Sequence, residues 1–321
     1  MLNKFMVTTS INSPTRAMME YVKRKEWKII MVGDLKTPHE EYRKLEKEYP
    51  NLYYMHPDTQ NLKYKELSEA IGWNRIMRRN LGFCEAYARG ADIIYSTDDD
   101  NILYENWGEN IYVGQEIIAH CWKSENGVFD PLSVTNVNYL WHRGYPSELI
   151  NSKNNIKYMG KIKRKVLVQA DLWDGVPDID AMARIIYKPR VKLNFDAPFC
   201  STDIAPFNSQ NTFIHRSVIP YYMVLPHAGR MDDIWASYIV QKIFPDSVIF
   251  GQPTVYQERH EPHHRNMKDL KDETLGYEYT LKFINGEFPL PEDTQKAYDL
   301  YKKFFVDYEE KEKNNFLNTI I

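Results

Sequence analysis

Short apolar runs and segments with helical spacing alternate through the first hundred residues of the chain. Residues 5–9 (FMVTT) and 27–32 (WKIIMV) have the composition of buried strands. Ser13 and Pro14 suit a helix N-cap and first helical position, and we expect that helix to end near residue 24. The pattern continues with a helix at 39–48, a strand at 52–55, a helix at 74–89 and a strand at 92–95. This alternation predicts an α/β fold with a Rossmann-like, mostly parallel sheet flanked by helices.

The pattern changes after about residue 105, where short strands and proline-containing loops replace the regular alternation. From residue 268 the chain is rich in Lys, Glu and Tyr at helical spacing. We therefore predict a domain at 1–267, made of a nucleotide-binding half (1–104) and an acceptor half (105–267). A C-terminal helical extension at 268–321 follows it.

Charge and cysteine usage exclude several classes of protein. The 321 residues carry 41 Lys and Arg against 44 Asp and Glu, and this net charge of −3 lacks the basic excess of a nucleic-acid binder. Cys84, Cys121 and Cys200 lie far apart without a CxxC pair, so a reducing, cytoplasmic location is favoured. No apolar run reaches the length of about 18 residues that a membrane span needs, so we expect no transmembrane segment. Peripheral membrane association stays open.

An acidic run follows the last of these predicted strands, in the sequence IIYSTDDDN at 93–101. Ligands of open α/β sheets bind at the carboxyl ends of the strands. Three adjacent carboxylates repel one another unless a cation compensates, and Mg²⁺ or Mn²⁺ would do so while bridging to phosphates. Asp98 and Asp100, two residues apart, would project to one side and hold the ion. The alternative is an exposed Asp-rich turn.

Three further clusters combine charge with turn or helix signals. Residues 174–181 (DGVPDIDA) mix carboxylates with turn formers, and a tight turn with a helix cap at Asp180 is the simpler interpretation. Asp232 and Asp233 precede an amphipathic helix, where they would either cap it or supply a general base for a sugar hydroxyl. Residues 257–264 (QERHEPHH) gather groups that bind metals or diphosphates, or else form a polar loop.

The predicted helix at 74–89 carries a basic stripe of Arg75, Arg78 and Arg79. Such a stripe is either solvated or faces the phosphates of a nucleotide. The ends of the first two strands are placed to meet ribose and base, and they carry three polar residues: Thr9, Ser10 and Asp34.

Together these features resemble a GT-A glycosyltransferase, and more narrowly the DUF288, or STELLO-like, glycosyltransferase family. The matching runs extend over most of the chain: TSINSPT (9–15), TDDDN (97–101), RGYP (143–146), DGVPDIDA (174–181) with Arg184, PFNSQNT (206–212), DIW (233–235), and Gln257 and Arg259 followed by His263 and Asp269. The chain departs from the family at His260, where an Asn is usual, and in the spacing to His263. His260, His263 and His264 therefore remain alternative metal ligands.

The resemblance implies a divalent metal, Mn²⁺ or Mg²⁺, held by the acidic run and a late histidine, and it implies a nucleotide-sugar donor. We expect Asp98, Asp100 and His263 to bind the metal and Asp233 to act as the base, with Asp232 as the fallback. The nucleotide-sugar contacts are expected from eight residues: Thr9, Ser10, Asp34, Arg78, Arg79, Asp99, Asp178 and Asp180.

The leading hypothesis is a metal-dependent, inverting glycosyltransferase of polysaccharide biosynthesis. It would move a hexosyl or pentosyl group from a UDP-sugar, in preference to a GDP-sugar, to a glycan or lipid-linked acceptor. One alternative is a sugar-nucleotide mutase of the reversibly glycosylated polypeptide type. Another is a non-catalytic GT-A scaffold that binds a polysaccharide synthase. The sequence leaves the sugar, the acceptor, the stereochemical outcome and the oligomeric state undetermined.

Overall fold

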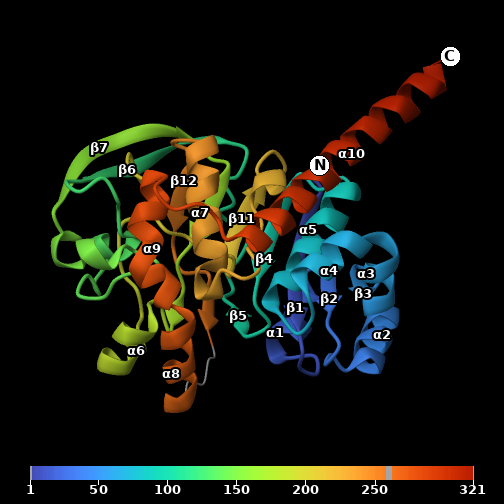
Figure 1. Cartoon of the computed structure of the whole chain (residues 1–321), viewed down its shortest axis with the longest axis horizontal. Helices are drawn as coiled ribbons and strands as arrows, with labels where there is room; N and C mark the ends of the chain where they lie inside the picture. Colours follow the sequence, from blue (N-terminus) through green and yellow to red (C-terminus); the bar gives the residue numbers. More distant parts are fainter. Residues whose placement is uncertain (1, 258–261, 321) are drawn as a thin grey trace.

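The computed structural model describes residues 2–257 and 262–320. Its first part alternates strands and helices as the sequence predicts (Figure 1). The elements of this part are β1 (Lys4–Ser10), α1 (Arg16–Tyr21), β2 (Lys28–Gly33), α2 (His39–Glu48), β3 (Leu52–Met55), α3 (Pro57–Lys63), α4 (Lys65–Ile71), α5 (Arg79–Ala88) and β4 (Ile93–Thr97).

The middle of the chain consists mostly of strands joined by long loops. Its elements are β5 (Asn101–Leu103), β6 (Glu116–Ser124), β7 (Ile156–Lys165), β8 (Val168–Asp171), β9 (Asp174–Gly175), α6 (Ala181–Tyr187), β10 (Phe199–Ser201), β11 (Asn211–His215), α7 (Asp232–Ile243), β12 (Val248–Gly251) and β13 (Val255–Gln257). Three helices end the chain: α8 (His263–Asp272), α9 (Thr274–Asn285) and α10 (Glu292–Ile320).

Ten strands form one sheet in the order β3-β2-β1-β4-β11-β8-β12-β10-β6-β7. The first four are parallel, whereas β11 runs antiparallel to both β4 and β8. The predicted α/β class with a Rossmann-like sheet is confirmed, and the sheet becomes mixed beyond β4. Because β1, β2 and β4 are parallel, their carboxyl ends meet at one edge.

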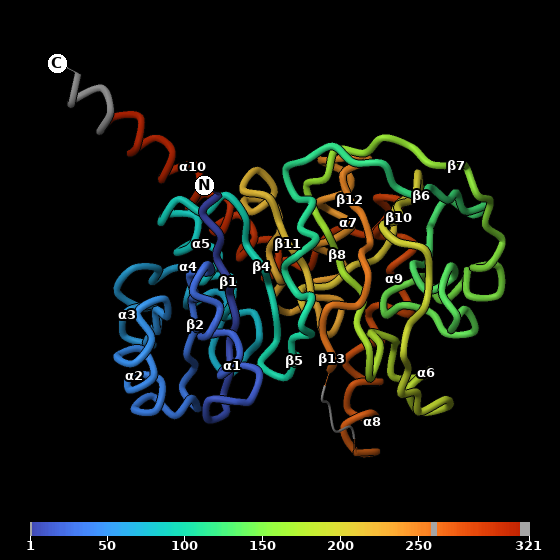
Figure 2. The backbone as a smooth tube through the Cα atoms, turned by 180° about the vertical axis from the view of Figure 1, so that it is seen from behind, coloured from blue at the N-terminus to red at the C-terminus, as the bar shows by residue number. Residues whose placement is uncertain are grey.

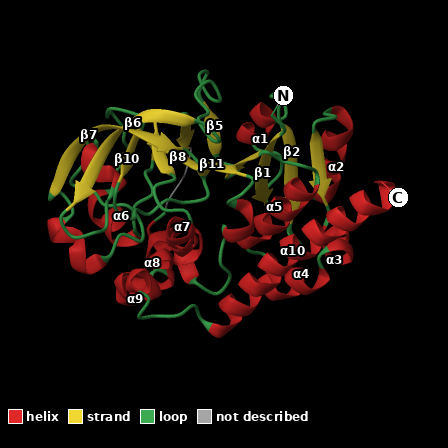
Figure 3. Ribbon diagram, turned by 90° about the horizontal axis from the view of Figure 1, so that it is seen from above, coloured by secondary structure: helices red, strands yellow, loops and turns green. Residues whose placement is uncertain are grey.

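Hydrophobic residues cover both faces of the sheet. Phe5 and Val7 of β1 pack into one cluster with α5, while Met6 between them packs into a second cluster with α1. This alternation follows from the two-residue period of a strand. Gly82 lets α5 approach closely, since a Cβ there would lie 2.5 Å from Val7 Cγ1. Figure 3 shows α5 and α10 on one side of the sheet and α1 on the other.

The C-terminal helices share the core of the rest of the molecule. The ring of Phe283 in α9 stacks on Trp235 of α7, with centroids 4.5 Å apart. The hydroxyl of Tyr301 in α10 donates to the carbonyl of Ile219 at 2.8 Å. The far end of α10 projects from the body (Figure 2).

The division of the chain at residue 267 stays a prediction. No helix of the described residues is long and apolar enough to cross a membrane.

Candidate functional site

A cleft of about 700 Å³ lies at the carboxyl ends of β1, β2 and β4. This volume falls in the range of small-ligand pockets. Segments far apart in sequence line the cleft, including the loops after these strands, the first turn of α7 and one side of α8. Its predicted site residues are Thr9, Ser10, Asp34, Arg79, Asp98, Asp99, Asp100, Asp178, Asp232 and Asp233.

The acidic run after β4 is tied to the loop after β1. Asp99 Oδ2 accepts hydrogen bonds from the hydroxyl of Ser10 and, at 3.0 Å, from Asn12 Nδ2. The hydroxyl of Thr15 donates to the carbonyl of Asp99 at 2.5 Å. These contacts join the two loops, so the carboxylates of the run are carried on a fixed backbone.

Arg79 supplies positive charge at the base of the acidic run. Its guanidinium is fully buried, forms an ion pair with Asp98, and donates from Nη1 to the carbonyl of Ser209 at 2.7 Å. Burial acts to lower the pKa of Arg79, but the Asp98 carboxylate outweighs it and raises that pKa. Asp98 therefore has an internal partner before any ligand arrives.

Asp34 and Thr9 hold the loops that form the nucleotide side of the cleft. Asp34 accepts backbone hydrogen bonds from Asn74 at 2.8 Å and Arg75 at 3.0 Å. The hydroxyl of Thr9 donates to the carbonyl of Val32 at 2.7 Å. Both predicted ligand contacts lie in the cleft, and their side chains also shape its wall.

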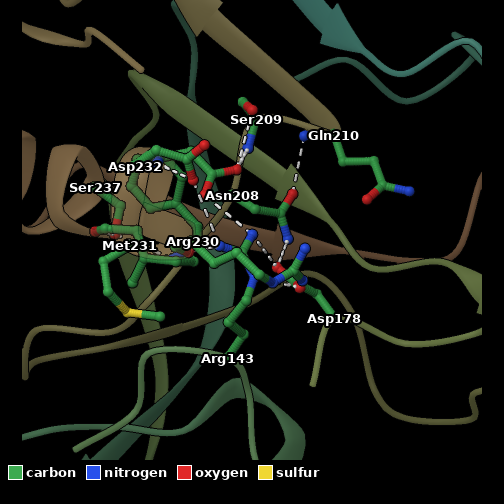
Figure 4. Close-up of polar contacts among 12 residues, drawn as sticks. Arg143, Asp178, Asn208, Ser209, Gln210, Arg230, Met231, Asp232 and Ser237 are labelled. Carbon is green, nitrogen blue, oxygen red and sulfur yellow. Dashed lines mark hydrogen bonds and ion pairs between the residues drawn. The ribbon is translucent and has the colours of Figure 1, made fainter. Parts of the chain in front are cut away.

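Arg143 organises a second group of residues in the cleft lining (Figure 4). It donates from Nε to Asp178 Oδ1 at 2.8 Å and from Nη2 to Asp178 Oδ2 at 3.0 Å, which is a bidentate pair. The same Nη2 lies 3.0 Å from Asp233 Oδ1. Asp233 Oδ2 accepts from the Ser209 backbone at 2.9 Å and from the Ser209 hydroxyl at 3.0 Å. Both oxygens of Asp233 are thus occupied.

Asp232 and Asp233 differ in protonation although they are adjacent. Burial and the neighbouring Asp233 carboxylate raise the pKa of Asp232 to about 8. Burial works in the same direction on Asp233, but the Arg143 guanidinium prevails and lowers its pKa. Asp232 Oδ1 accepts from the Asp233 backbone at 2.9 Å and lies 3.7 Å from Arg143 Nη1. Of the two, Asp232 is the stronger base.

Three predicted site residues are not brought into the cleft. Arg78 is buried on the other side of its helix turn, where Nη1 donates to the carbonyl of Ser68 at 3.0 Å. Asp180 caps α6 by accepting from the Ala183 backbone at 2.8 Å, as the simpler interpretation of that run predicts. His263 is exposed at the first turn of α8 and does not line the cleft.

These positions correct the ligand roles given to Arg78 and Asp180, because both side chains are used inside the fold. Neither His263 nor the exposed His264 lines the cleft, so the geometry gives no metal contact to either. His260 lies outside the described residues.

The charge of the cleft favours a cation. Nine aspartates line it against six arginines and lysines, so negative charge is in excess even with Asp232 protonated. An anionic diphosphate would be repelled unless a cation entered with it. The described residues contain no group of three His, Cys, Asp or Glu side chains that could hold a metal alone. Mg²⁺, however, is commonly held by one or two carboxylates together with substrate phosphates, and Asp98 and Asp100 offer that chemistry.

Sequence reasoning gave no role to several residues of the cleft. Arg143 and Ser209 belong to the RGYP and PFNSQNT runs that carry the family resemblance. Their place in these runs is the sequence signal that could have identified them. Arg230, Arg265 and Lys268 also line the cleft, and only the fold brings them there.

The fold is an open α/β sheet with an acidic, arginine-bearing cleft at its strand ends, which is where such sheets bind their ligands. The chain matches no known protein-family model. It is 23% identical over 262 residues to Probable glycosyltransferase STELLO1 and 23% identical over 306 residues to Probable glycosyltransferase STELLO2, both of Arabidopsis thaliana. These alignments include 75% and 88% of this chain. The chain is therefore similar in sequence to both STELLO proteins.

The chain spans only 33% and 39% of the length of these two relatives. Among solved structures, glucosyl-3-phosphoglycerate synthase from Mycobacterium tuberculosis in complex with phosphoglyceric acid aligns with 90% of this chain and 82% of its own, with a TM-score of 0.43 and 11% identity.

Proposed function

We propose that this chain is a glycosyltransferase that uses a divalent metal to transfer a sugar from a nucleotide sugar, with inversion, to a glycan or lipid-linked acceptor. The observation that carries the proposal is that two charged groups line one cleft. They are the acidic run of Asp98, Asp99 and Asp100 and the Arg143 cluster with Asp232. The similarity to the STELLO proteins supports the same reaction class.

Asp98 and Asp100 would hold Mn²⁺ or Mg²⁺, which when bound supplies charge stabilisation for the departing nucleoside diphosphate. Arg79 stands beside Asp98 and adds a fixed positive charge on the same side. A preorganised charge of this kind costs no reorganisation during the reaction. Ser10, Asn12 and Thr15 hold the acidic loop in place for the donor.

We assign the general base to Asp232 in place of the sequence-based choice, Asp233. A base works best when its pKa is close to the working pH, and the pKa of Asp232 is about 8. Asp233 accepts hydrogen bonds on both oxygens and neutralises Arg143, which suits a positioning residue. In an inverting displacement, Asp232 would accept the proton of the acceptor hydroxyl while that oxygen attacks the anomeric carbon.

The donor in this proposal is a UDP-sugar, and the site of action is cytoplasmic, in keeping with three free cysteines. The mutase and the scaffold remain the rival functions.

A panel of nucleotide sugars tests the proposal, with and without Mn²⁺ and with candidate acceptors. Transferase activity predicts release of nucleoside diphosphate that depends on metal and increases with an acceptor. Conversion of the donor into a ring-contracted nucleotide sugar, without release, would identify the mutase. Neither release nor binding of any nucleotide would support the scaffold. Lys44→Gln is a suitable control, because Lys44 is exposed on α2 and does not line the cleft.

A further inference from the structure

Large apolar side chains are exposed on both sides of the cleft mouth. On the side of the first strands, Ile11 and Leu35 follow β1 and β2 and are 51% and 55% exposed. On the other side, exposed residues cluster on and near α6, at Tyr139, Met182, Ile186, Tyr187 and Met267. We call this second group, together with the exposed residues Lys188, Lys192 and Lys271, the α6 surface.

Helix α6 presents an apolar face to solvent. Its residues Ala181, Ala183 and Arg184 are buried, whereas Met182 and Ile186 are 42% and 62% exposed. Tyr187 packs edge-on against Tyr139, with ring centroids 5.5 Å apart, so this pair extends the apolar surface beyond the helix. The outer face of a surface helix is ordinarily polar, and a contiguous exposed patch marks an interaction site.

Helix α8 connects the α6 surface to the cleft. Arg184 of α6 donates from Nη2 to Asp269 Oδ2 of α8 at 2.9 Å, which holds the two helices together. Arg265 and Lys268 of α8 line the cleft, and Met267 between them is 40% exposed. Figures 1 and 2 show α6 and α8 side by side at the edge of the molecule to which the loops after β1 and β2 also point.

The charge around the patch is basic. Lys188 and Lys192 follow α6 and are exposed, and Lys271 is exposed on α8. In the described part of the chain, Arg265 and Lys268 have no ion-pair partner within 4.0 Å, and Asp272 is the exposed acid on the same helix. Exposed apolar side chains set among lysines and arginines are the composition that binds an anionic lipid surface.

We propose that the α6 surface docks on an anionic lipid bilayer, which would place α8, at the border of the cleft, close to the membrane. The apolar residues of α6 would enter the headgroup region while the surrounding lysines contact lipid phosphates. The docking itself does not depend on the proposed function. If the chain is a glycosyltransferase, this orientation would present the cleft to an acceptor anchored in the bilayer.

Co-sedimentation with vesicles tests the docking, using phosphatidylcholine mixed with phosphatidylglycerol against phosphatidylcholine alone. The full chain should bind the mixed vesicles and should bind less as salt increases, because the lysine contribution is screened. Met182→Ser with Ile186→Ser should weaken this binding about tenfold or more, since two apolar side chains no longer enter the interface. Lys188→Gln with Lys192→Gln should weaken binding to the mixed vesicles selectively.

Leu62→Ser with Val306→Ser is the matched control. It removes two side chains that are 86% and 57% exposed on α3 and α10, away from α6, and should leave vesicle binding unchanged. The proposal is overturned if the full chain does not bind the mixed vesicles, or if the control loses as much binding as the α6 variant. It is also overturned if sedimentation velocity shows a dimer that the α6 variant dissociates, because a second copy would then cover the surface.

Discussion

Asp232 and Asp233 are adjacent buried carboxyls to which the proposed reaction gives different roles. Asp232→Asn removes basicity at nearly constant size and should lower single-turnover transfer by about 10²–10⁴-fold, the usual range for lost acid–base assistance. Donor affinity should stay near that of the unmodified chain. The pH–rate profile should rise through an apparent pKa near 8, the value for Asp232.

Asp233→Asn serves as the comparison within the same pair. It leaves Arg143 without one of its buried carboxylates, so it should reduce the free energy of unfolding by about 3 kcal/mol, the scale for breaking a buried ion pair. If Asp233→Asn loses transfer without losing stability while Asp232→Asn stays active, the base is Asp233.

Asp171 makes stability depend on pH from inside the sheet. It is buried at the end of β8, accepts from Gln169 Nε2 at 2.9 Å, and has its pKa raised by burial to about 7. The folded state therefore binds this proton more tightly than the unfolded chain, and its contribution to stability falls as pH rises from about 4 to 7.

Asp171→Asn mimics the protonated carboxyl and should remove this dependence. The melting temperature of Asp171→Asn minus that of the unmodified chain should become larger as the pH rises from 5 to 8, as measured by thermal unfolding. Asp196→Asn, at an exposed position, should show a constant difference. A constant difference for Asp171→Asn as well would mean that its carboxyl titrates normally.

At the scale of elements, the early strands and helices were predictable because local signals agree with the fold. The helix at 39–48 and the strand at 52–55 have the predicted bounds, and the strands at 5–9, 27–32 and 92–95 are displaced by one or two residues. The nearly continuous burial of β1 and β2 explains this success, since strands that are buried on both faces appear in the sequence as apolar runs.

Helix ends and short helices were less predictable. The first helix begins at Arg16 with Thr15 as N-cap, rather than at Pro14, because the Thr15 hydroxyl accepts from the Met18 backbone at 3.1 Å. The helix predicted at 74–89 is a 3₁₀ turn, Ile76–Arg78, followed by α5, and Asn74 has a left-handed φ of 57°. Helices α3 and α4 carry no strong apolar periodicity and were missed.

The candidate site was predictable only where it depends on strand ends. Asp98–Asp100, Ser10 and Asp34 meet there because parallel strands end at one edge. Arg78 was misjudged because helical spacing does not tell which face is buried. The Arg143–Asp178–Asp233 cluster joins residues up to 90 apart in sequence, so tertiary contact alone defines it.

Helix α8 depends on a glycine for its approach to the cleft. Gly229, in the 3₁₀ turn Gly229–Met231, has a φ of +59°, and a Cβ there would lie 2.2 Å from the Asp272 carbonyl. Gly229→Ala should therefore reduce stability by about 3 kcal/mol, combining left-handed strain with overpacking, and should weaken donor binding by displacing α8.

Gly286→Ala separates the two effects. Its φ is +78° and its Cβ would meet nothing within 4 Å, so only strain of about 1–2 kcal/mol should appear in denaturant unfolding. Equal losses for the two variants would mean that Gly229 does not hold α8 in place.

At the scale of the whole molecule, contacts of the C-terminal helices with the core indicate that residues 1–267 do not fold as an independent domain. Because Trp235 packs on Phe283 and Tyr301 bonds to the Ile219 carbonyl, a chain of residues 1–267 should expose core surface and lack a cooperative unfolding transition. A chain of residues 1–314 keeps these contacts and should unfold cooperatively. Cooperative unfolding of 1–267, seen by near-UV circular dichroism, would instead support an independent domain with an extension.

In the proposed reaction the acidic run binds a metal together with a nucleoside diphosphate. Calorimetric titration of UDP, with and without Mn²⁺, into the full chain and into Asp100→Asn tests it most directly. Asp100 is preferable to Asp98, because removing Asp98 also takes the partner of buried Arg79 and confuses stability with binding. We predict Mn²⁺-dependent binding of UDP that Asp100→Asn abolishes. UDP binding of equal strength without metal and in Asp100→Asn would contradict the proposal.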